Sequence, residues 1–237
     1  MAEQGRISQQ LNGAKVLVAT PGCPGLHGLP EAIRALGAEC LSLNLASDFT
    51  DLATIESAFA RVRTALGGID ALVLAVGNAQ SRQAQPLAAQ SAEQWRAACL
   101  DPLRTSRHCL QAAWRVLAGH PASIVLLGPN LSLTGAPGLV ALSVLSEGQR
   151  GLMKSAARQW GGQGIRLNWL GVASTVFAAE LADARLPQSP EMGPPPPALG
   201  AAPEVDGGVV RSIAMLIGSK DITGASIPVD GGLWMVP

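Results

Sequence analysis

The sequence predicts an α/β fold: a doubly wound parallel sheet with helices on both of its faces. Short apolar runs of strand character alternate along the chain with longer segments in which apolar residues recur every three or four positions. The short runs are apolar at nearly every position, which is typical of strands whose two faces are both covered. Parallel strands joined by helices need right-handed crossovers, and these place helices above and below the sheet.

Six runs are expected to form the strands. In chain order they span residues 16–19, 40–43, 71–76, 124–127, 166–170 and 226–229. Between them, an apolar face on a 3.6-residue period predicts helices over residues 52–66, 103–117 and 142–156. Pro203 followed by Glu204 is expected to open a last helix that reaches Leu216.

The composition predicts one domain over residues 1–237. A surface excursion is expected at residues 187–203, which hold seven of the 17 prolines and favour stiff, extended backbone. The chain carries 17 basic and 17 acidic side chains, so nucleic acid and anionic membranes are not expected partners. It has no apolar run of about 18 residues and begins with a polar segment, so we expect a cytoplasmic protein with no membrane span.

The four cysteines lie far apart with no Cys-x-x-Cys pair among them. They are Cys23, Cys40, Cys99 and Cys109. This spacing indicates reduced thiols and gives no reason to expect a metal site.

Two motifs carry a resemblance to a known family. A glycine-rich turn, Thr-Pro-Gly-Cys-Pro-Gly-Leu-His-Gly, follows the first strand at residues 20–28, and Ile-Thr-Gly-Ala-Ser-Ile-Pro-Val-Asp-Gly-Gly occupies residues 222–232. With residues 67–73 and 164–168, these segments look like the short-chain dehydrogenase/reductase family. The resemblance covers almost the whole chain and implies a Rossmann-like fold, which in the family holds NAD(P) on the glycine-rich turn.

That turn departs from the family's phosphate-binding pattern, Thr-Gly-x-x-x-Gly-x-Gly. Aligned on Thr20, the three glycine positions hold Pro21, Gly25 and His27. Pro21 and Pro24 remove amide donors, and His27 places an imidazole where backbone would approach phosphate. We interpret the loop as a tight turn that binds no cofactor, with NAD(P) binding as the alternative.

Asp48 is the remaining candidate for cofactor binding. It looks like the family aspartate that contacts the adenine amino group, and its alternative role is to cap a helix together with Thr50 or Asp51. Asn44 stands near the family's ribose-binding position. Because too few residues follow Leu45 to form another crossover and strand, we expect one helix and one edge strand of the family fold to be missing.

The family's catalytic residues are replaced at all four matching positions. The Tyr-x-x-x-Lys segment aligns with Leu142 and Ser146, the catalytic serine with Pro129, and the proton-relay asparagine with Pro102. The chain contains no tyrosine, so no shift of the alignment supplies the missing phenol. The sequence therefore predicts no catalytic residues.

Other polar side chains lie near the expected cleft and could in principle take over. They are Ser132, Thr134, Ser143, Ser146 and Glu147. On a helix such groups are more often capping or solvated, and His108 is interpreted as structural, at a subunit contact.

These observations lead to a hypothesis with two alternatives. The chain is expected to be a non-catalytic subunit that joins an active paralogue of the family in a hetero-oligomer, a heterotetramer. It looks similar to inactive subunits of heteromeric dehydrogenases that act on alcohols or hydroxyacyl-CoA compounds. The alternatives are a divergent NAD(P)H-dependent oxidoreductase that uses other groups, and a metabolite sensor that keeps the fold.

Overall fold

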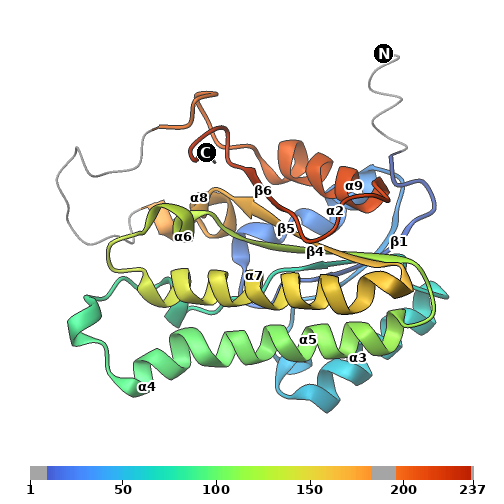
Figure 1. Cartoon of the computed structure of the whole chain (residues 1–237), viewed down its shortest axis with the longest axis horizontal. Helices are drawn as coiled ribbons and strands as arrows, with labels where there is room; N and C mark the ends of the chain where they lie inside the picture. The colour runs from blue at the N-terminus through green and yellow to red at the C-terminus, as the bar shows by residue number, and fades with distance from the viewer. Residues whose placement is uncertain (1–9, 183–195, 236–237) are drawn as a thin grey trace.

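The computed structural model describes residues 10–182 and 196–235 of the chain. Six strands in this part of the chain form one parallel sheet, in the order β2-β1-β3-β4-β5-β6 (Figure 1). Their bounds are β1 Lys15–Ala19, β2 Glu39–Leu43, β3 Ala71–Leu74, β4 Ala122–Pro129, β5 Ile165–Val172 and β6 Ser226–Val229. Each overlaps one of the six predicted runs, which confirms the doubly wound α/β fold.

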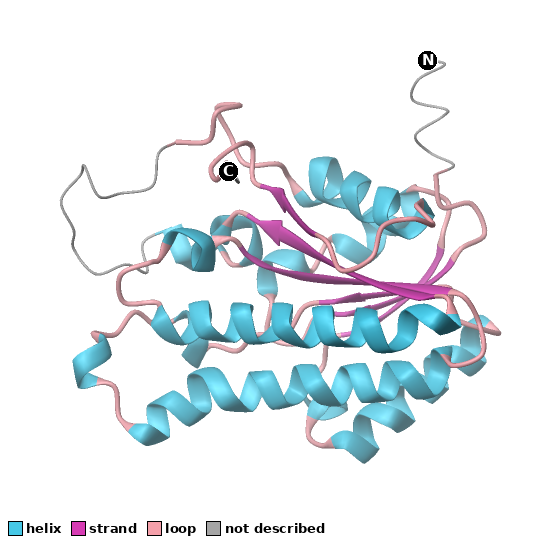
Figure 2. Cartoon of the chain, viewed as in Figure 1, coloured by secondary structure: helices cyan, strands magenta, loops and turns pink. Residues whose placement is uncertain are grey.

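Helices cover both faces of the sheet (Figure 2). One face carries α2 (Leu29–Ala35) and α9 (Val210–Gly218). The opposite face carries α3 (Leu52–Leu66), α5 (Asp101–Leu117) and α7 (Val140–Trp160). Three one-turn helices lie in the connections: α4 Ala92–Trp95, α6 Leu131–Thr134 and α8 Ser174–Phe177.

The core is built from strands that are apolar on both faces. In β1, Val16 and Val18 contact the cluster beneath α2 and α9, whereas Leu17 and Ala19 contact the cluster beneath α3 and α5. All four side chains are fully buried. Successive side chains of a strand point to opposite faces, and here both faces are covered. The strands are therefore apolar at nearly every position.

β2 forms one edge of the sheet. Residues 44–51 connect it directly to α3, and among the described residues no strand lies beyond it. The prediction of a sheet one strand and one helix shorter than the family norm agrees with this arrangement.

Several boundaries differ from the predictions. The run 71–76 ends as a strand at Leu74, while β4 and β5 extend further than the predicted runs. The last helix opens after Glu204 with a π-helical turn, Val205–Val209, before regular helix begins at Val210. Gly207 in that turn has non-helical dihedral angles, which explains the irregular start.

The predicted proline-rich excursion falls largely on residues 187–195, which lie outside the described residues. The rest of it, residues 196–203, is described and lies against the C-terminal segment. The Leu199 amide donates to the Gly231 carbonyl at 2.9 Å. The Leu199 side chain itself is 83% exposed, as expected for a surface excursion.

The helices of residues 10–182 and 196–235 include none that combines the length and the apolar character needed to cross a membrane. All four cysteines are free and buried. Burial raises the pKa of the Cys40 thiol to about 11 and also raises the pKa of Cys23 and Cys109. These thiols are therefore protonated near neutral pH.

Candidate functional site

The four positions that match the family's catalytic residues lie on β4, α5 and α7. Pro129 ends β4, Leu142 and Ser146 lie on the first turns of α7, and Pro102 lies at the start of α5. All four are buried.

Neither α7 residue offers a reactive group. Leu142 is 1% exposed and belongs to the apolar cluster that also includes buried residues of α2 and α9. Ser146 is fully buried, and its hydroxyl donates to the Leu142 carbonyl one turn earlier, at 2.9 Å. A hydroxyl bonded in this way to its own helix has no proton directed at a substrate.

Pro129 is followed by a polar residue that the sequence analysis did not single out. The Asn130 amide donates to the buried Asp230 carboxylate, which also accepts the backbone amides of Gly232, Leu233 and Trp234. Asp230 is 2% exposed. The contact therefore fastens the end of β4 to the C-terminal segment and leaves the carboxylate occupied by donors.

Pro102 shapes the helix in which it lies. The proline has no amide hydrogen, and a π-helical turn, Arg96–Leu100, immediately precedes it. One turn later, the Ser106 hydroxyl donates to the Pro102 carbonyl at 2.9 Å and accepts the Gln149 amide at 2.9 Å. Gln149 also donates to the Val76 carbonyl, at 2.9 Å. This buried network joins α5, α7 and the end of β3, and its polar atoms are used in structure.

The other polar candidates are also engaged elsewhere. The Ser143 and Thr134 hydroxyls donate to carbonyls of their own segments, Leu139 at 3.0 Å and Leu131 at 3.2 Å. Glu147 is exposed and pairs with Arg150 at 2.8 Å. Ser132 is half-buried beside them in α6. We find no pair of these groups arranged as donor and base.

His108 lies in the middle of α5, close enough to the start of α3 to feel the charge of Asp51. It is half-buried, and its Nε2 lies 3.0 Å from Arg107 Nη2. Desolvation and then the charges of Arg107 and Arg104 lower the pKa of His108, opposed by the charge of Asp51. The structure gives His108 no contact with the four catalytic positions.

The glycine-rich loop closes against two neighbouring loops. A Cβ on Gly22 would overlap the Gly77 carbonyl after β3, and a Cβ on Gly25 would overlap the Val176 carbonyl after β5. Pro21 is buried and its carbonyl accepts the Gly77 amide at 3.1 Å. His27 is exposed, so the contacts that close the loop are made by the glycines and not by the imidazole.

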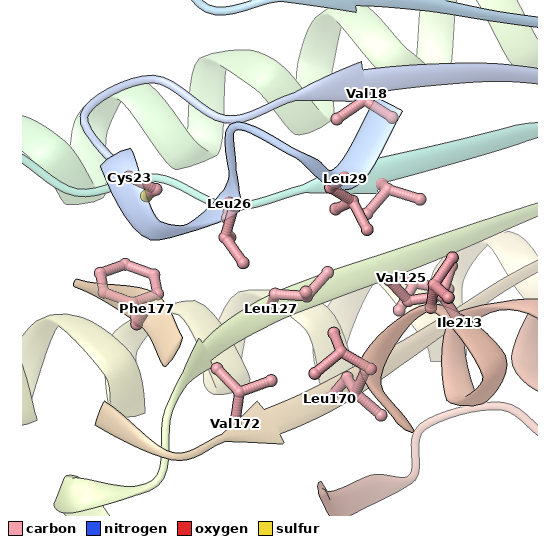
Figure 3. Packing of buried hydrophobic residues seen from close by; sticks show 14 of the residues in the cluster. Val18, Cys23, Leu26, Leu29, Val125, Leu127, Leu170, Val172, Phe177 and Ile213 are labelled. Carbon is pink, nitrogen blue, oxygen red and sulfur yellow. The ribbon is translucent and has the colours of Figure 1, made fainter. Parts of the chain in front are cut away.

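Side chains fill the space under this loop. Phe177, at the end of α8, is 1% exposed, and Cys23 and Leu26 in the loop are fully buried. Figure 3 shows Phe177 facing Cys23, with Leu127 of β4 to one side and Val172 of β5 below. The ring lies 3.3 Å from the position of a Cβ on Gly77. Among the residues that sequence reasoning missed, Phe177 matters most. Its only signal was a large aromatic residue after a central strand, in a chain with three phenylalanines.

Arg82 holds the three loops together. Its guanidinium donates to the Gly22 carbonyl after β1 and pairs with Glu180 after α8, at 2.6 Å. The Arg82 side chain is 11% exposed. The pKa of Glu180 is lowered by its own backbone amide and then by Arg82. The clamp ties the loop after β3 to the loops after β1 and β5.

The residues present do not fit the family's dinucleotide. In the family, the pyrophosphate lies on the backbone of the turn after the first strand, at a helix N-terminus. Here that backbone touches Gly77 and Val176, and Phe177 and Cys23 occupy the space beneath it. A hollow of about 840 Å³ does lie at the sheet, but at the amino ends of the strands, beside Lys15 and Asp70.

The predicted adenine contact, Asp48, is engaged in an ion pair. Its carboxylate lies 3.2 Å from Arg61 Nη2, with 17% of the Asp48 side chain exposed. The capping role considered for Asp48 is carried out by Asp51, whose carboxylate accepts the Thr54 amide at 2.9 Å. Asn44 is exposed at the edge of the sheet. Elsewhere, the described residues bring no three histidine, cysteine, aspartate or glutamate side chains close enough to hold a metal ion.

Known proteins resemble this chain in sequence and in fold. A family profile described as Enoyl-(Acyl carrier protein) reductase matches residues 8–234. The chain is 30% identical over 215 residues to the short-chain dehydrogenase/reductase eriH of Hericium erinaceus, covering 87% of this chain and 81% of that one. It is 27% identical over 233 residues to the 3-oxoacyl-[acyl-carrier-protein] reductase FabG of Escherichia coli, covering 94% and 88%.

A solved structure shares the fold. Enoyl-[acyl-carrier-protein] reductase (NADH) from Aquifex aeolicus superposes with a TM-score of 0.78 at 15% identity, covering 94% of this chain and 98% of that one. The family profile over residues 8–234 and the relative at 30% identity lead to one assignment. The chain belongs to the short-chain dehydrogenase/reductase family of oxidoreductases.

Proposed function

We propose that this chain is a non-catalytic subunit of the family. It assembles with an active paralogous dehydrogenase into a hetero-oligomer, a heterotetramer, and binds no NAD(P) itself. It stabilises the partner or shapes the partner's site through its C-terminal tail, residues 233–237, of which residues 236–237 lie outside the described part.

The observation that carries this proposal is the filled cleft. Phe177 and Cys23 occupy the space beneath the glycine-rich loop, and the loop backbone touches Gly77. A pyrophosphate would have to displace packed side chains and also separate loops that Arg82 clamps together. Removing a buried aromatic ring from its contacts costs about 3–5 kcal/mol, which a dinucleotide would have to offset on binding.

The catalytic positions support the same conclusion. Leu142 carries no ionisable group, and Ser146 is bonded to its own helix. A positioned acid or base typically contributes about 10²–10⁴ to a reaction rate. The family's tyrosine, lysine, serine and relay asparagine are all replaced here. The chain therefore lacks the groups that move a proton to a ketone.

The class of the partner's substrate follows from the relatives. Their names include 3-oxoacyl-[acyl-carrier-protein] reductases and a D-threitol dehydrogenase. We infer that the partner interconverts a ketone and an alcohol, either on an acyl thioester such as a hydroxyacyl-CoA or on a simple alcohol.

The test is made with two purified components: this chain and an active dehydrogenase of the family that has an intact Tyr-x-x-x-Lys motif, sought first among the genes that neighbour the one for this chain. Calorimetric titration of this chain alone with NADH and NADPH is expected to show no binding up to about 1 mM, the upper end of common KM values. When co-expressed, the two chains should co-purify. Replacing the partner's tyrosine by phenylalanine should then abolish all turnover, because no active site resides on this chain.

Two results would contradict the proposal. One is saturable NADH or NADPH binding together with ketone reduction by this chain alone. The other is a stable homotetramer of this chain that does not associate with the active dehydrogenase.

The second candidate is a divergent NAD(P)H-dependent oxidoreductase. It is favoured by the family assignment itself, since the matching relatives are described as reductases and dehydrogenases. It requires turnover by the isolated chain, and that turnover should fall when Ser143, Ser146 or Glu147 is replaced.

A further inference from the structure

The hollow at the amino ends of the strands is a second feature of the molecule, separate from the filled cleft. It lies at the opposite end of the sheet from α6 and α8 (Figure 1). Its lining comes from the end of α3, the turn before β3, the turn between α5 and β4, and the start of β1. Its volume of about 840 Å³ is within the usual range of pockets that hold small molecules. We call it the amino-end hollow.

The amino-end hollow is lined by more basic than acidic side chains. These side chains are Lys15, Arg63, Arg115, His120, Glu56 and Asp70. Glu56 pairs with Arg115, and Asp70 accepts the backbone amide of Lys15 at 2.8 Å. Within residues 10–182 and 196–235, neither the Lys15 ammonium nor the Arg63 guanidinium has a carboxylate within ion-pair distance. Two positive charges of the lining therefore have no counter-charge in this part of the chain.

Basic side chains near the end of a helix often serve only to cap its last carbonyls. Backbone amides already do this at the end of α3, where the Arg63 carbonyl accepts the Gly68 amide at 3.0 Å and the Thr64 carbonyl accepts the Gly67 amide at 3.2 Å. The Lys15 ammonium donates to the Gly67 carbonyl at 3.1 Å, which uses one of its three hydrogens. The Arg63 guanidinium donates to no group of the described residues, so its five N–H donors are available to a ligand.

Two glycines form the wall of the hollow beside Lys15. A Cβ on Gly67 would lie 3.3 Å from Lys15 Nζ, and a Cβ on Gly68 would lie 4.0 Å from it. A larger residue at either position would cover the ammonium. Glycine at both positions leaves it open to a bound molecule.

The donors and acceptors of the hollow favour one class of ligand. A guanidinium binds two oxygens of a phosphate at once, and an ammonium adds a point charge. Asp70 Oδ1 and Glu56 Oε2 are not used in the contacts above and can accept hydroxyl groups. No aromatic side chain of the described residues lines the hollow, so a nucleobase would find no ring on which to stack.

We propose that the amino-end hollow binds a small phosphate ester that carries hydroxyl groups, such as a sugar phosphate, with Arg63 and Lys15 on the phosphate. The site is remote from α6 and α8 and takes no part in a reaction. Because the ligand binds only the folded chain, its binding stabilises the fold. The proposal does not rest on the proposed function.

The test is calorimetric titration of the full chain with ribose 5-phosphate at 50 mM salt. We expect saturable 1:1 binding with a Kd below about 1 mM. Inorganic phosphate should bind more weakly, because it lacks the hydroxyl groups, and ribose should not bind. Raising the salt to 500 mM should weaken the binding of ribose 5-phosphate by roughly tenfold, because salt screens the charges of the exposed site.

Two variants of exposed residues on α3 locate the site. Arg63→Gln removes the charged donors and should weaken binding by roughly tenfold or more. Ala60→Glu places a carboxylate in the lining and should have at least as large an effect. Ala53→Glu is the matched control, because it makes the same change about two turns earlier on α3, outside the hollow. It should leave the Kd unchanged, and circular dichroism checks that all three variants keep the fold.

Three outcomes would overturn the inference. Ribose 5-phosphate shows no saturable binding up to about 10 mM, Arg63→Gln and Ala60→Glu bind it as well as the unmodified chain does, or Ala53→Glu weakens binding as much as Ala60→Glu does. None of these measurements involves NAD(P), turnover or a second chain. Failure of this inference is therefore distinct from failure of the proposed function.

Discussion

Gly22 shows how one residue brings two loops into contact, the glycine-rich loop after β1 and the loop after β3. Its φ of +70° lies in the left-handed region, and its α-carbon approaches the Gly77 carbonyl so closely that a Cβ would overlap it. The residue is exposed, so its tolerance to substitution is decided by backbone contact rather than by burial.

We therefore expect Gly22→Ala to destabilise the protein more than an ordinary glycine substitution. The left-handed conformation and the overlap together should lower the free energy of unfolding by about 3 kcal/mol. Gly13→Ala is the matched control, because Gly13 has a φ of +74° with no atom within 4 Å of its Cβ position. It should cost about 1 kcal/mol. Urea unfolding of both variants measures the difference, and equal losses would mean that the two loops are not in contact.

His108 predicts how stability depends on pH. Its folded pKa lies below the unfolded value of 6.5, through desolvation and the charges of Arg107 and Arg104. The unfolded chain therefore binds more protons than the folded chain as pH falls below about 6.5, and stability declines there. His108→Gln should make Tm less sensitive to pH between 7 and 5 than in the unmodified chain. An unchanged slope of Tm against pH would contradict this assignment.

At the scale of elements, the start of α3 depends on a carboxylate. Asp51 is the N-cap of the helix and accepts the Thr54 amide at 2.9 Å. Asp48 lies in the turn before the helix and pairs with Arg61 of α3. The sequence placed both acids at a helix start. It did not distinguish them, because either side chain has the length and charge to cap.

Asp51→Ala should lower Tm by about 2–4 °C, the usual effect of losing a cap in a domain of this size. Asp48→Ala removes a surface ion pair and should lower Tm by less than about 2 °C. The pKa of Asp51 is lowered by the Thr54 hydrogen bonds, so this stabilisation is present above its unfolded pKa and is lost as acid protonates the carboxylate. Thermal unfolding at neutral pH and near pH 3 checks the expected Tm losses and their dependence on pH. A larger loss of Tm in Asp48→Ala than in Asp51→Ala would mean that Asp48 is the cap.

At the scale of the whole molecule, the replaced catalytic residues are part of the core. Leu142 is 1% exposed and Ser146 is fully buried, so both side chains contribute to packing. Restoring the family residues one turn apart should therefore not restore a reaction.

The double variant L142Y/S146K is expected to show no NADPH oxidation with a 3-ketoacyl thioester. It should also lose about 3 kcal/mol or more of stability, because a phenol and an ammonium would be forced into an apolar core. V144Y/S155K places the same residues at exposed positions of the same helix and should be close to neutral in urea unfolding. Turnover by L142Y/S146K would contradict the conclusion that the cleft is filled.

Most of the fold could be predicted from the sequence. The six strands were visible because strands buried on both faces, such as Val16 to Ala19 of β1, must be apolar throughout. Helix α3 was predicted at both ends, since its apolar spacing stops where Gly67 takes a left-handed conformation. The start of the last helix was less predictable, because the irregular dihedral angles of Gly207 depend on its surroundings.

The sequence by itself determined the family resemblance and the absence of the family's tyrosine. A chain without tyrosine cannot supply the family's proton donor in any fold. The tertiary structure alone decided what fills the cleft, since Phe177, Cys23 and Arg82 come from three segments far apart in the chain. Such contacts form only when the sheet brings the ends of its strands together. The spacing of residues along the chain therefore cannot predict them.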